Sequence, residues 1–98
     1  MNVEQAAMDT ATGIVWDMQN ESESNMWRIS NLYLVKGIHE KSIFGLDLRA
    51  ESRPNNRKGG QIAGKLCTTN FYEGKTRISR ADLIKVLTTK IMEEGGAS

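Results

Sequence analysis

The sequence predicts an α+β fold: a four-stranded, mostly antiparallel sheet with a C-terminal helix packed on one face and an N-terminal helical arm. Three patterns support this. Apolar side chains alternate with polar ones from Phe44 to Ala50, which is typical of a half-buried strand. Leu83, Ile84, Leu87 and Ile91 form an apolar stripe at helical spacing. Small apolar residues also recur every three or four positions from Val3 to Met18.

The N-terminal segment, residues 1–25, is interpreted as an arm followed by a polar linker. The apolar recurrence favours a helix through about Thr12, where Gly13 interrupts the pattern. Ile14, Val15 and Trp16 would equally suit a short strand, so residues 13–18 stay open between helix and strand. Residues 19–25 are polar and turn-prone, and they are expected to form the linker.

The body of the domain is expected to span residues 26–94. A first strand is predicted from Trp27 to Val35, a turn at residues 37–41, and a second strand over residues 44–50. Pro54 and the Asn and Gly residues around it indicate that residues 51–60 form a loop. A third strand is predicted at residues 62–67. A tight turn at Glu73–Gly74 then leads into a fourth strand that ends at Ile78.

The C-terminal helix carries the clearest local signals in the chain. Ser79 and Asp82 resemble a capping box, with Ile78 and Leu83 in the positions of a hydrophobic staple. Gly95 and Gly96 are expected to end the helix, which leaves residues 95–98 as a disordered tail.

Composition indicates one cytoplasmic domain. The chain has 98 residues, of which 39% are hydrophobic and 26% charged, as in an ordinary soluble protein. Its only cysteine, Cys67, cannot form an internal disulfide, which favours a reducing compartment. No signal peptide is recognisable at the N-terminus. The longest apolar run, residues 32–35, is far shorter than the ~20 residues of a membrane span.

No motif of the sequence predicts catalysis. Residues 59–65 match the start of a phosphate-binding loop, but Leu66 replaces the Ser or Thr that would hold magnesium. His39 is the only histidine and falls in a predicted turn. A metal site needs three or four ligands, and no other residue is spaced to pair with His39. Cys67 has no basic neighbours that would lower its pKa and is expected to be a packing residue. We therefore expect no enzyme activity, no metal and no cofactor.

Charge is divided unequally along the chain. Residues 1–48 carry seven acidic and three basic side chains, a net of −4, and residues 49–98 carry ten basic and five acidic ones, a net of +5. Such asymmetry is typical of a protein with a polyanionic partner. We therefore expect a small nucleic-acid-binding protein, for DNA or RNA, whose basic hairpin loop contacts phosphates, with Phe71 and Tyr72 available for base stacking. The expected contact residues are Arg49, Arg53, Arg57, Lys58, Lys65, Arg77 and Arg80.

Two alternatives concern the N-terminal arm. It could make the chain a protein-protein interaction module, either an inhibitor or adaptor of a larger complex or a homodimer in which acidic Glu4, Asp9 and Asp17 face the basic half of a second copy. It could instead cover the open sheet face of its own domain. The order of four strands and a helix is similar to that of whirly-type single-strand DNA-binding modules, an architectural analogy that assigns no residue.

Overall fold

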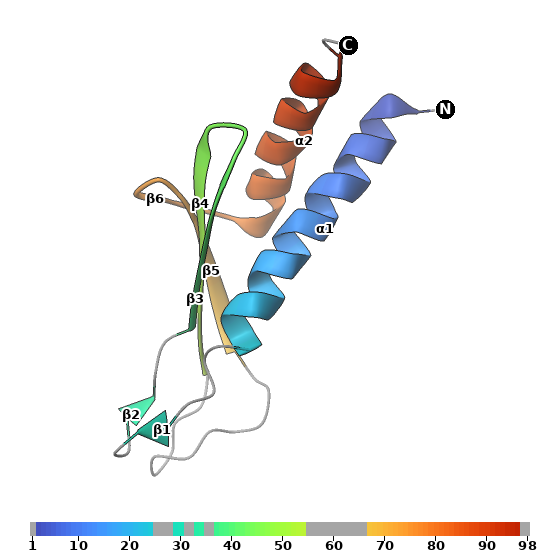
Figure 1. Ribbon diagram of the computed structural model, residues 1–98. Coiled ribbons are helices and arrows are strands. Elements are labelled where there is room, and N and C mark those ends of the chain that lie inside the picture. The colour runs from blue at the N-terminus through green and yellow to red at the C-terminus, as the bar shows by residue number, and fades with distance from the viewer. Residues whose placement is uncertain (1, 25–28, 31–32, 35–36, 55–66, 97–98) are drawn as a thin grey trace.

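The computed structural model describes residues 2–24, 29–30, 33–34, 37–54 and 67–96. In chain order the elements are α1 (Val3–Ser24), β1 (Ile29–Ser30), β2 (Tyr33–Leu34), β3 (Gly37–Ile43), β4 (Leu46–Pro54), β5 (Cys67–Glu73), β6 (Thr76–Ile78) and α2 (Arg80–Gly96). β3 to β6 form an antiparallel sheet in sequential order, and β1 pairs separately with β2 (Figure 1). The α+β fold class predicted from the sequence is confirmed.

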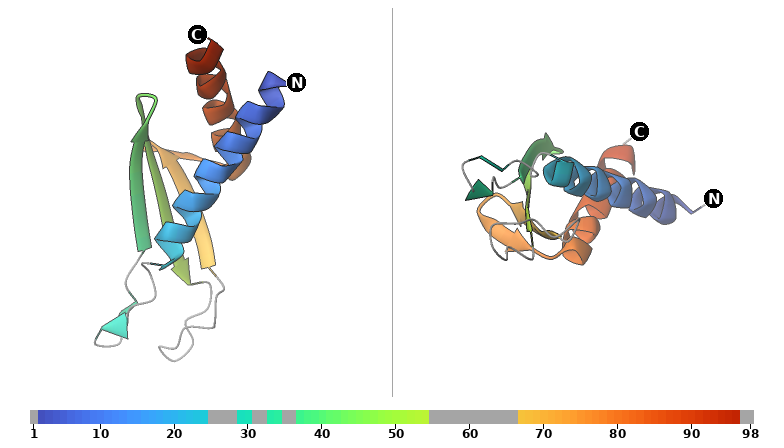
Figure 2. Two further views of the ribbon diagram at one scale, coloured as in Figure 1. Left: turned by 45° about the vertical axis from the view of Figure 1, so that its right-hand side comes forward. Right: turned by 90° about the horizontal axis from the view of Figure 1, so that it is seen from below.

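The two helices lie on one side of the sheet. α1 packs against β3, β4 and α2, while α2 packs mainly against α1 and also reaches β5. The two views of Figure 2 show the helices side by side with both termini at the same end of the pair. Of the two alternatives for the N-terminal arm, the structure therefore shows the one in which it covers the sheet face of its own domain.

The core lies between α1, α2 and the sheet. Alternate residues of β4 face the helices, so Leu48 and Ala50 are buried, and Phe71 of β5 lies beside Ala50 in the strand register. The helices contribute fully buried side chains, which are Ala11, Val15 and Met18 of α1 and Leu83 and Leu87 of α2. Burying one such large side chain stabilises the fold by about 1.5–3 kcal/mol. The apolar stripe predicted for the C-terminal helix is confirmed.

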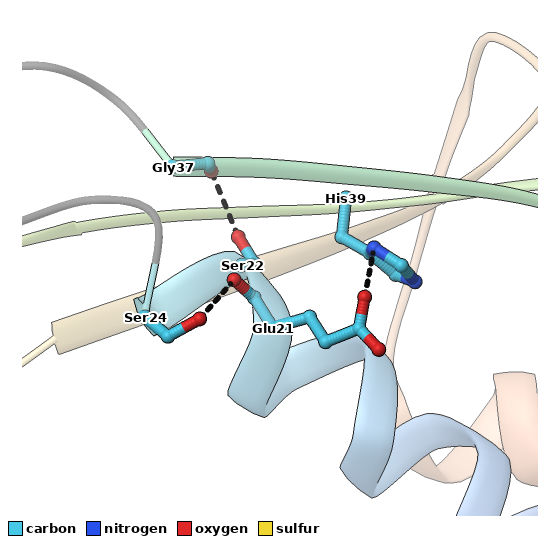
Figure 3. A network of polar contacts seen from close by, with 5 residues as sticks. All are labelled: Glu21, Ser22, Ser24, Gly37 and His39. Atoms are coloured by element: carbon cyan, nitrogen blue, oxygen red, sulfur yellow. Dashed lines mark hydrogen bonds and ion pairs between the residues drawn. The ribbon is translucent and has the colours of Figure 1, made fainter.

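α1 is longer than predicted. It continues without a break through residues 13–18 and includes residues 19–24, so the predicted linker is wrong for these residues. The reason is tertiary packing, which outweighs weak local helix propensity. Met18 and Ser22 are buried, and the Ser22 hydroxyl donates a hydrogen bond of 2.8 Å to the carbonyl oxygen of Gly37. This contact fixes the last turn of α1 against β3 (Figure 3).

The sheet differs from the prediction at its N-terminal edge. The predicted turn at residues 37–41 is wrong, because these residues belong to β3 and pair with β4 from Gly37↔Ser52 to Ile43↔Leu46. The long first strand is also wrong, since Ile29–Ser30 and Tyr33–Leu34 pair antiparallel as separate short strands. Most side chains of β3 are polar, so its sequence lacks the alternation of apolar and polar residues that indicates a strand and favours a turn instead. Trp27, Leu32 and Val35 lie outside the described residues.

Both tight hairpin turns contain positive φ angles. Phe44 (φ 52°) and Gly45 (φ 79°) connect β3 to β4, so the strand predicted from residue 44 begins at Leu46 instead. Two successive residues with positive φ produce the backbone twist that suits a two-residue hairpin. The turn predicted at Glu73–Gly74 is confirmed, with Gly74 at φ 60°.

β4 extends further than predicted, because residues 51–54 still pair with β5, ending with Pro54 opposite Cys67. The predicted third strand falls outside the described residues except for Cys67, the first residue of β5. The fourth strand is confirmed to end at Ile78.

The start of α2 is as predicted, and its end lies two residues later than predicted. The Ser79 hydroxyl accepts a hydrogen bond of 3.1 Å from the Asp82 backbone N–H, the contact of a helix N-cap. The helix runs through Gly96, so Gly95 and Gly96 end it but are helical rather than part of a disordered tail.

Candidate functional site

A groove opens beside the part of β5 that β6 does not cover. β6 pairs only with Phe71, Tyr72 and Glu73, so the edge of β5 at Thr69 and Asn70 faces a hollow of about 600 Å³. The end of α1 and the start of α2 form its other walls. We call this hollow the β5-edge groove, and its lining residues are Gln19, Thr69, Asn70, Phe71, Arg77, Ile78, Ser79 and Arg80.

Arg77 is held at the groove by Asn70. Its Nη2 donates a hydrogen bond of 2.9 Å to Oδ1 of Asn70, and its side chain is exposed. The alternation of β6 explains the placement, because Ile78 packs against the core cluster while its neighbour Arg77 points to the other side of the sheet.

Arg80 occupies the opposite wall, where it joins α2 to α1. Its Nη1 donates a hydrogen bond of 2.8 Å to Oε1 of Gln19, sixty-one positions earlier in the chain. Its guanidinium carbon lies 5.7 Å from the centre of the Trp16 ring, within the range of a cation–π contact. Trp16 and Gln19 are three residues apart on α1 and therefore lie on neighbouring parts of its surface.

Among the described residues that line it, the groove has two positive charges and no carboxylate. Two of the seven contact residues expected from the sequence, Arg77 and Arg80, are thus brought together at one hollow. The sequence did not indicate the contributions of Trp16, Gln19 and Asn70, because these come from separate elements. Two local signals in the sequence did relate to the groove. They are the alternation before Ile78, which places Arg77, and the cap at Ser79, which precedes Arg80 at the start of α2.

Arg49 lies in a different electrostatic setting, on the sheet face opposite the helices. Its Nη2 lies 2.5 Å from Oε2 of Glu51, whose side chain is only 8% exposed, and its Nε lies 3.7 Å from Oε1 of Glu40. The Arg49 guanidinium carbon also lies 6.0 Å from the centre of the Tyr72 ring. We call Arg49, Glu40 and Glu51 the Arg49 cluster. Two carboxylates neutralise the arginine there.

The remaining expected contact residues are divided. Arg53 is exposed on β4, and it pairs in register with Thr68, two residues before Asn70. No ion pair joins it to another residue that the structure describes. Arg57, Lys58 and Lys65, and with them the segment that resembles a phosphate-binding loop, lie outside the described residues.

The two aromatic residues expected to stack on bases have different surroundings. Phe71 is buried, with 4% of its surface exposed, and contributes to the core cluster. Tyr72 is half-buried on the opposite sheet face, between Arg49 and Arg77 in the strand register. Phe71 is therefore not available for stacking.

His39 joins β3 to the end of α1. Its Nδ1 lies 2.9 Å from Oε2 of Glu21 (Figure 3). Its Nε2 is buried and has no hydrogen-bond partner among the residues that the structure describes. It is a strand residue and not the turn residue that was predicted. Within the described ranges, no group of three His, Cys, Asp or Glu side chains could hold a metal ion.

Cys67, at the start of β5, has the environment of an unreactive thiol. Burial raises the pKa of Cys67 to about 11, and the negative charge of Glu23 and a hydrogen bond to that carboxylate act in the same direction. A thiol with a raised pKa carries little thiolate at neutral pH. This agrees with the prediction that Cys67 has no environment that lowers its pKa.

Comparison of the chain with protein-family models, curated proteins and solved structures found no match. The roles assigned to individual residues therefore derive from the geometry of this chain. Neither of the two described helices is long and apolar enough to cross a membrane.

Proposed function

We propose that the protein is a small, non-enzymatic nucleic-acid-binding protein whose β5-edge groove contacts the phosphate backbone. The observation that carries the proposal is the pair of arginines, Arg77 and Arg80, at a hollow with no carboxylate among the lining residues that the structure describes. An anion entering this groove meets two guanidinium groups and, within the described part of the lining, no side chain of like charge.

Both arginines keep donors for a ligand. A guanidinium has five N–H donors, and the hydrogen bonds to Asn70 and Gln19 each use one of them. These amide contacts also hold the two side chains in place, which reduces the conformational entropy lost on binding. The planar fork of arginine is suited to bidentate contact with phosphate oxygens.

Arg53 extends the positive surface toward the basic loop expected from the sequence. Its strand partner Thr68 and the groove residue Asn70 lie on the same side of β5. Residues 55–66, which include Arg57, Lys58 and Lys65, connect Pro54 to Cys67, and these two residues are paired at this end of the sheet. A bound nucleic-acid strand would therefore run from the β5-edge groove past Arg53 to the expected loop. The cytoplasmic location and the absence of metal or cofactor are part of the same proposal.

The test is the salt dependence of binding to a labelled single-stranded oligonucleotide. For three or four phosphate contacts on a single strand, log affinity is expected to fall with log salt at a slope of about −2 to −3. Replacing Arg57 and Lys58 together with Ala should flatten the slope by about 0.7 per lost contact. Absence of binding at low salt contradicts the proposal, and an unchanged slope in the double variant removes the loop from it.

A second candidate function, a homodimeric interaction module, is favoured by an apolar hollow at the free ends of the helices. Val3 is 65% exposed and Met92 36% exposed at this hollow. Residues 2–11 and 89–95 contain four acidic side chains and one basic one, a net of −3. A second copy packed antiparallel would place this acidic end beside the arginines of the β5-edge groove, twice by symmetry. The hollow is lined by Val3, Ala6, Ala7, Thr10, Ile91, Met92 and Gly95.

The molar mass in solution tests this candidate. Deleting α1 would remove Ala11, Val15 and Met18 from the core, so point variants are needed. We expect a dimer that Val3→Asp combined with Met92→Asp converts to a folded monomer, as measured by light scattering. A monomer at every concentration before substitution rejects the homodimer.

A further inference from the structure

Trp16 is placed unusually for a residue of its size. It is 51% exposed on α1, although Val15 beside it is completely buried in the core. Large aromatic side chains usually bury most of their area, so an exposed indole beside a charged groove is an informative feature. Packing of the core does not explain this tryptophan.

The ring is held from one side by Arg80. The guanidinium carbon is 5.7 Å from the ring centre, and the same guanidinium donates its hydrogen bond to Gln19, one turn along α1. Arg80 is thereby fixed between an amide and an indole. Since half of the Trp16 surface stays exposed, a flat ligand can still reach the ring.

The neighbourhood combines the two contacts that a nucleotide needs. Arg80 belongs both to the β5-edge groove and to the contact with Trp16, and Arg77 lies in the same groove. A phosphate held by these arginines would place its attached base near the indole. Aromatic side chains stack on bases of any sequence, because every base has a π face.

We infer that Trp16 is a base-stacking platform and that the ligand of the β5-edge groove is a single-stranded nucleic acid, an inference that rests on the proposed function. In a duplex the bases are paired and stacked on their neighbours, and exposing one requires unstacking. An unpaired strand presents base faces and phosphates together. Duplex nucleic acid would contact the arginines only.

Tryptophan fluorescence tests this directly. The chain contains only two tryptophans, so Trp27→Phe leaves Trp16 as the single indole reporter. Titration with oligothymidylate and with oligouridylate should quench the fluorescence, and the stronger of the two identifies DNA or RNA. A duplex of the same length and inorganic polyphosphate should leave it nearly unchanged. Equal quenching by the duplex, or no quenching by either single strand, overturns the inference.

Affinity measurements on the otherwise unaltered chain separate this inference from the proposed function. Trp16→Ala should weaken single-strand binding about tenfold and leave polyphosphate binding unchanged, whereas Trp16→Phe should retain most of the affinity. If Trp16→Ala binds as tightly as the unaltered protein while Arg77→Ala with Arg80→Ala does not bind, the platform is wrong and the proposed function stands. If the unaltered protein binds no oligonucleotide, both fail.

Discussion

The Arg49 cluster and the β5-edge groove place the same side-chain type in opposite electrostatic settings. Arg49 has Glu51 and Glu40 within 4 Å, so its charge is used to neutralise carboxylates, one of them nearly buried. Arg77 and Arg80 each donate a hydrogen bond to an amide oxygen, and Arg80 also lies over an indole. Basic residues thus differ in electrostatic environment according to the carboxylates around them, which the sequence position alone does not reveal.

Cys67 shows the largest expected effect, in which burial raises the thiol pKa and the neighbouring Glu23 carboxylate adds to it. With its pKa raised to about 11 from an ordinary value of 9.0, the thiolate fraction at pH 8 should be about 100-fold lower than in the unfolded chain. Alkylation by iodoacetamide at pH 8 should be slowed to a similar extent, and Glu23→Gln should recover part of the rate. Alkylation as fast as in the unfolded chain would contradict this environment.

The same pKa predicts how stability changes at alkaline pH. Between pH 9 and pH 11 the unfolded thiol loses its proton while the folded thiol keeps it, so the unfolded state binds fewer protons. The Cys67 contribution to the free energy of unfolding is therefore complete below pH 9 and is lost as pH rises toward 11. Cys67→Ser should reduce this part of the alkaline loss, as measured by urea unfolding at pH 8 and pH 10.

Arg49→Ala is expected to lower the free energy of unfolding by about 2 kcal/mol, because the nearly buried Glu51 carboxylate loses a charged partner. Arg77→Ala is the matched control. Its side chain is exposed and bonds a neutral amide, so its removal should change stability by less than about 0.5 kcal/mol. Urea unfolding of both variants measures the difference, and equal effects would show that the two arginines do not differ as described.

Asn70→Asp turns the groove into a copy of the Arg49 cluster. The new carboxylate would lie about where the amide oxygen now accepts from Arg77, at 2.9 Å, and would pair with it. Oligonucleotide affinity should fall about fivefold, a cost of about 1 kcal/mol in binding free energy. Stability should also fall, because residue 70 lies opposite the nearly buried Glu51 in the strand register. Asn2→Asp adds the same charge at the far end of α1, where residue 2 caps the helix, and should leave binding unchanged. Equal losses in the two variants would mean that only net charge matters.

Glu40→Gln removes one of the two carboxylates from the Arg49 cluster and so makes it more like the β5-edge groove. Glu40 is 69% exposed and its contact with Arg49 is long, at 3.7 Å, so removing its charge leaves Arg49 still paired with Glu51. We expect affinity for an oligonucleotide to rise by less than about twofold. A larger rise, measured by fluorescence anisotropy, would place Arg49 in the interface.

The parts of the fold that the sequence predicted are those specified by neighbouring residues. The cap at Ser79, the stripe of Leu83 and Leu87 and the turn at Gly74 each depend on a few consecutive positions. The length of α1 and the existence of β3 depend on partners far along the chain, such as the bond from Ser22 to Gly37. Polar segments of this kind carry weak local signals, so tertiary contacts decide their structure.

The candidate site was predictable only in part for the same reason. The density of basic residues between positions 49 and 65 predicts phosphate contacts at the loop. Arg49 in that stretch is nevertheless neutralised by its neighbours. Arg77 and Arg80 were recognised as basic, but the groove also needs Gln19 and Asn70, which only the packing of α1 and β5 brings near them. The composition of a short segment does not show which residues of other helices and strands will lie beside it.

The central claim is that phosphates bind at Arg77 and Arg80, which form no ion pair with a described carboxylate. Arg49, which is neutralised by two carboxylates, does not bind phosphate in this account. Its most direct test compares the salt dependence of oligonucleotide binding for Arg77→Ala with Arg80→Ala and for Arg49→Ala, each at a temperature where the variant is folded. We expect the first to lose about tenfold or more in affinity and to flatten the slope by about 1.4, the value for two single-strand phosphate contacts. The second should stay within about twofold of the unaltered protein. An equal or greater loss in Arg49→Ala would contradict the claim.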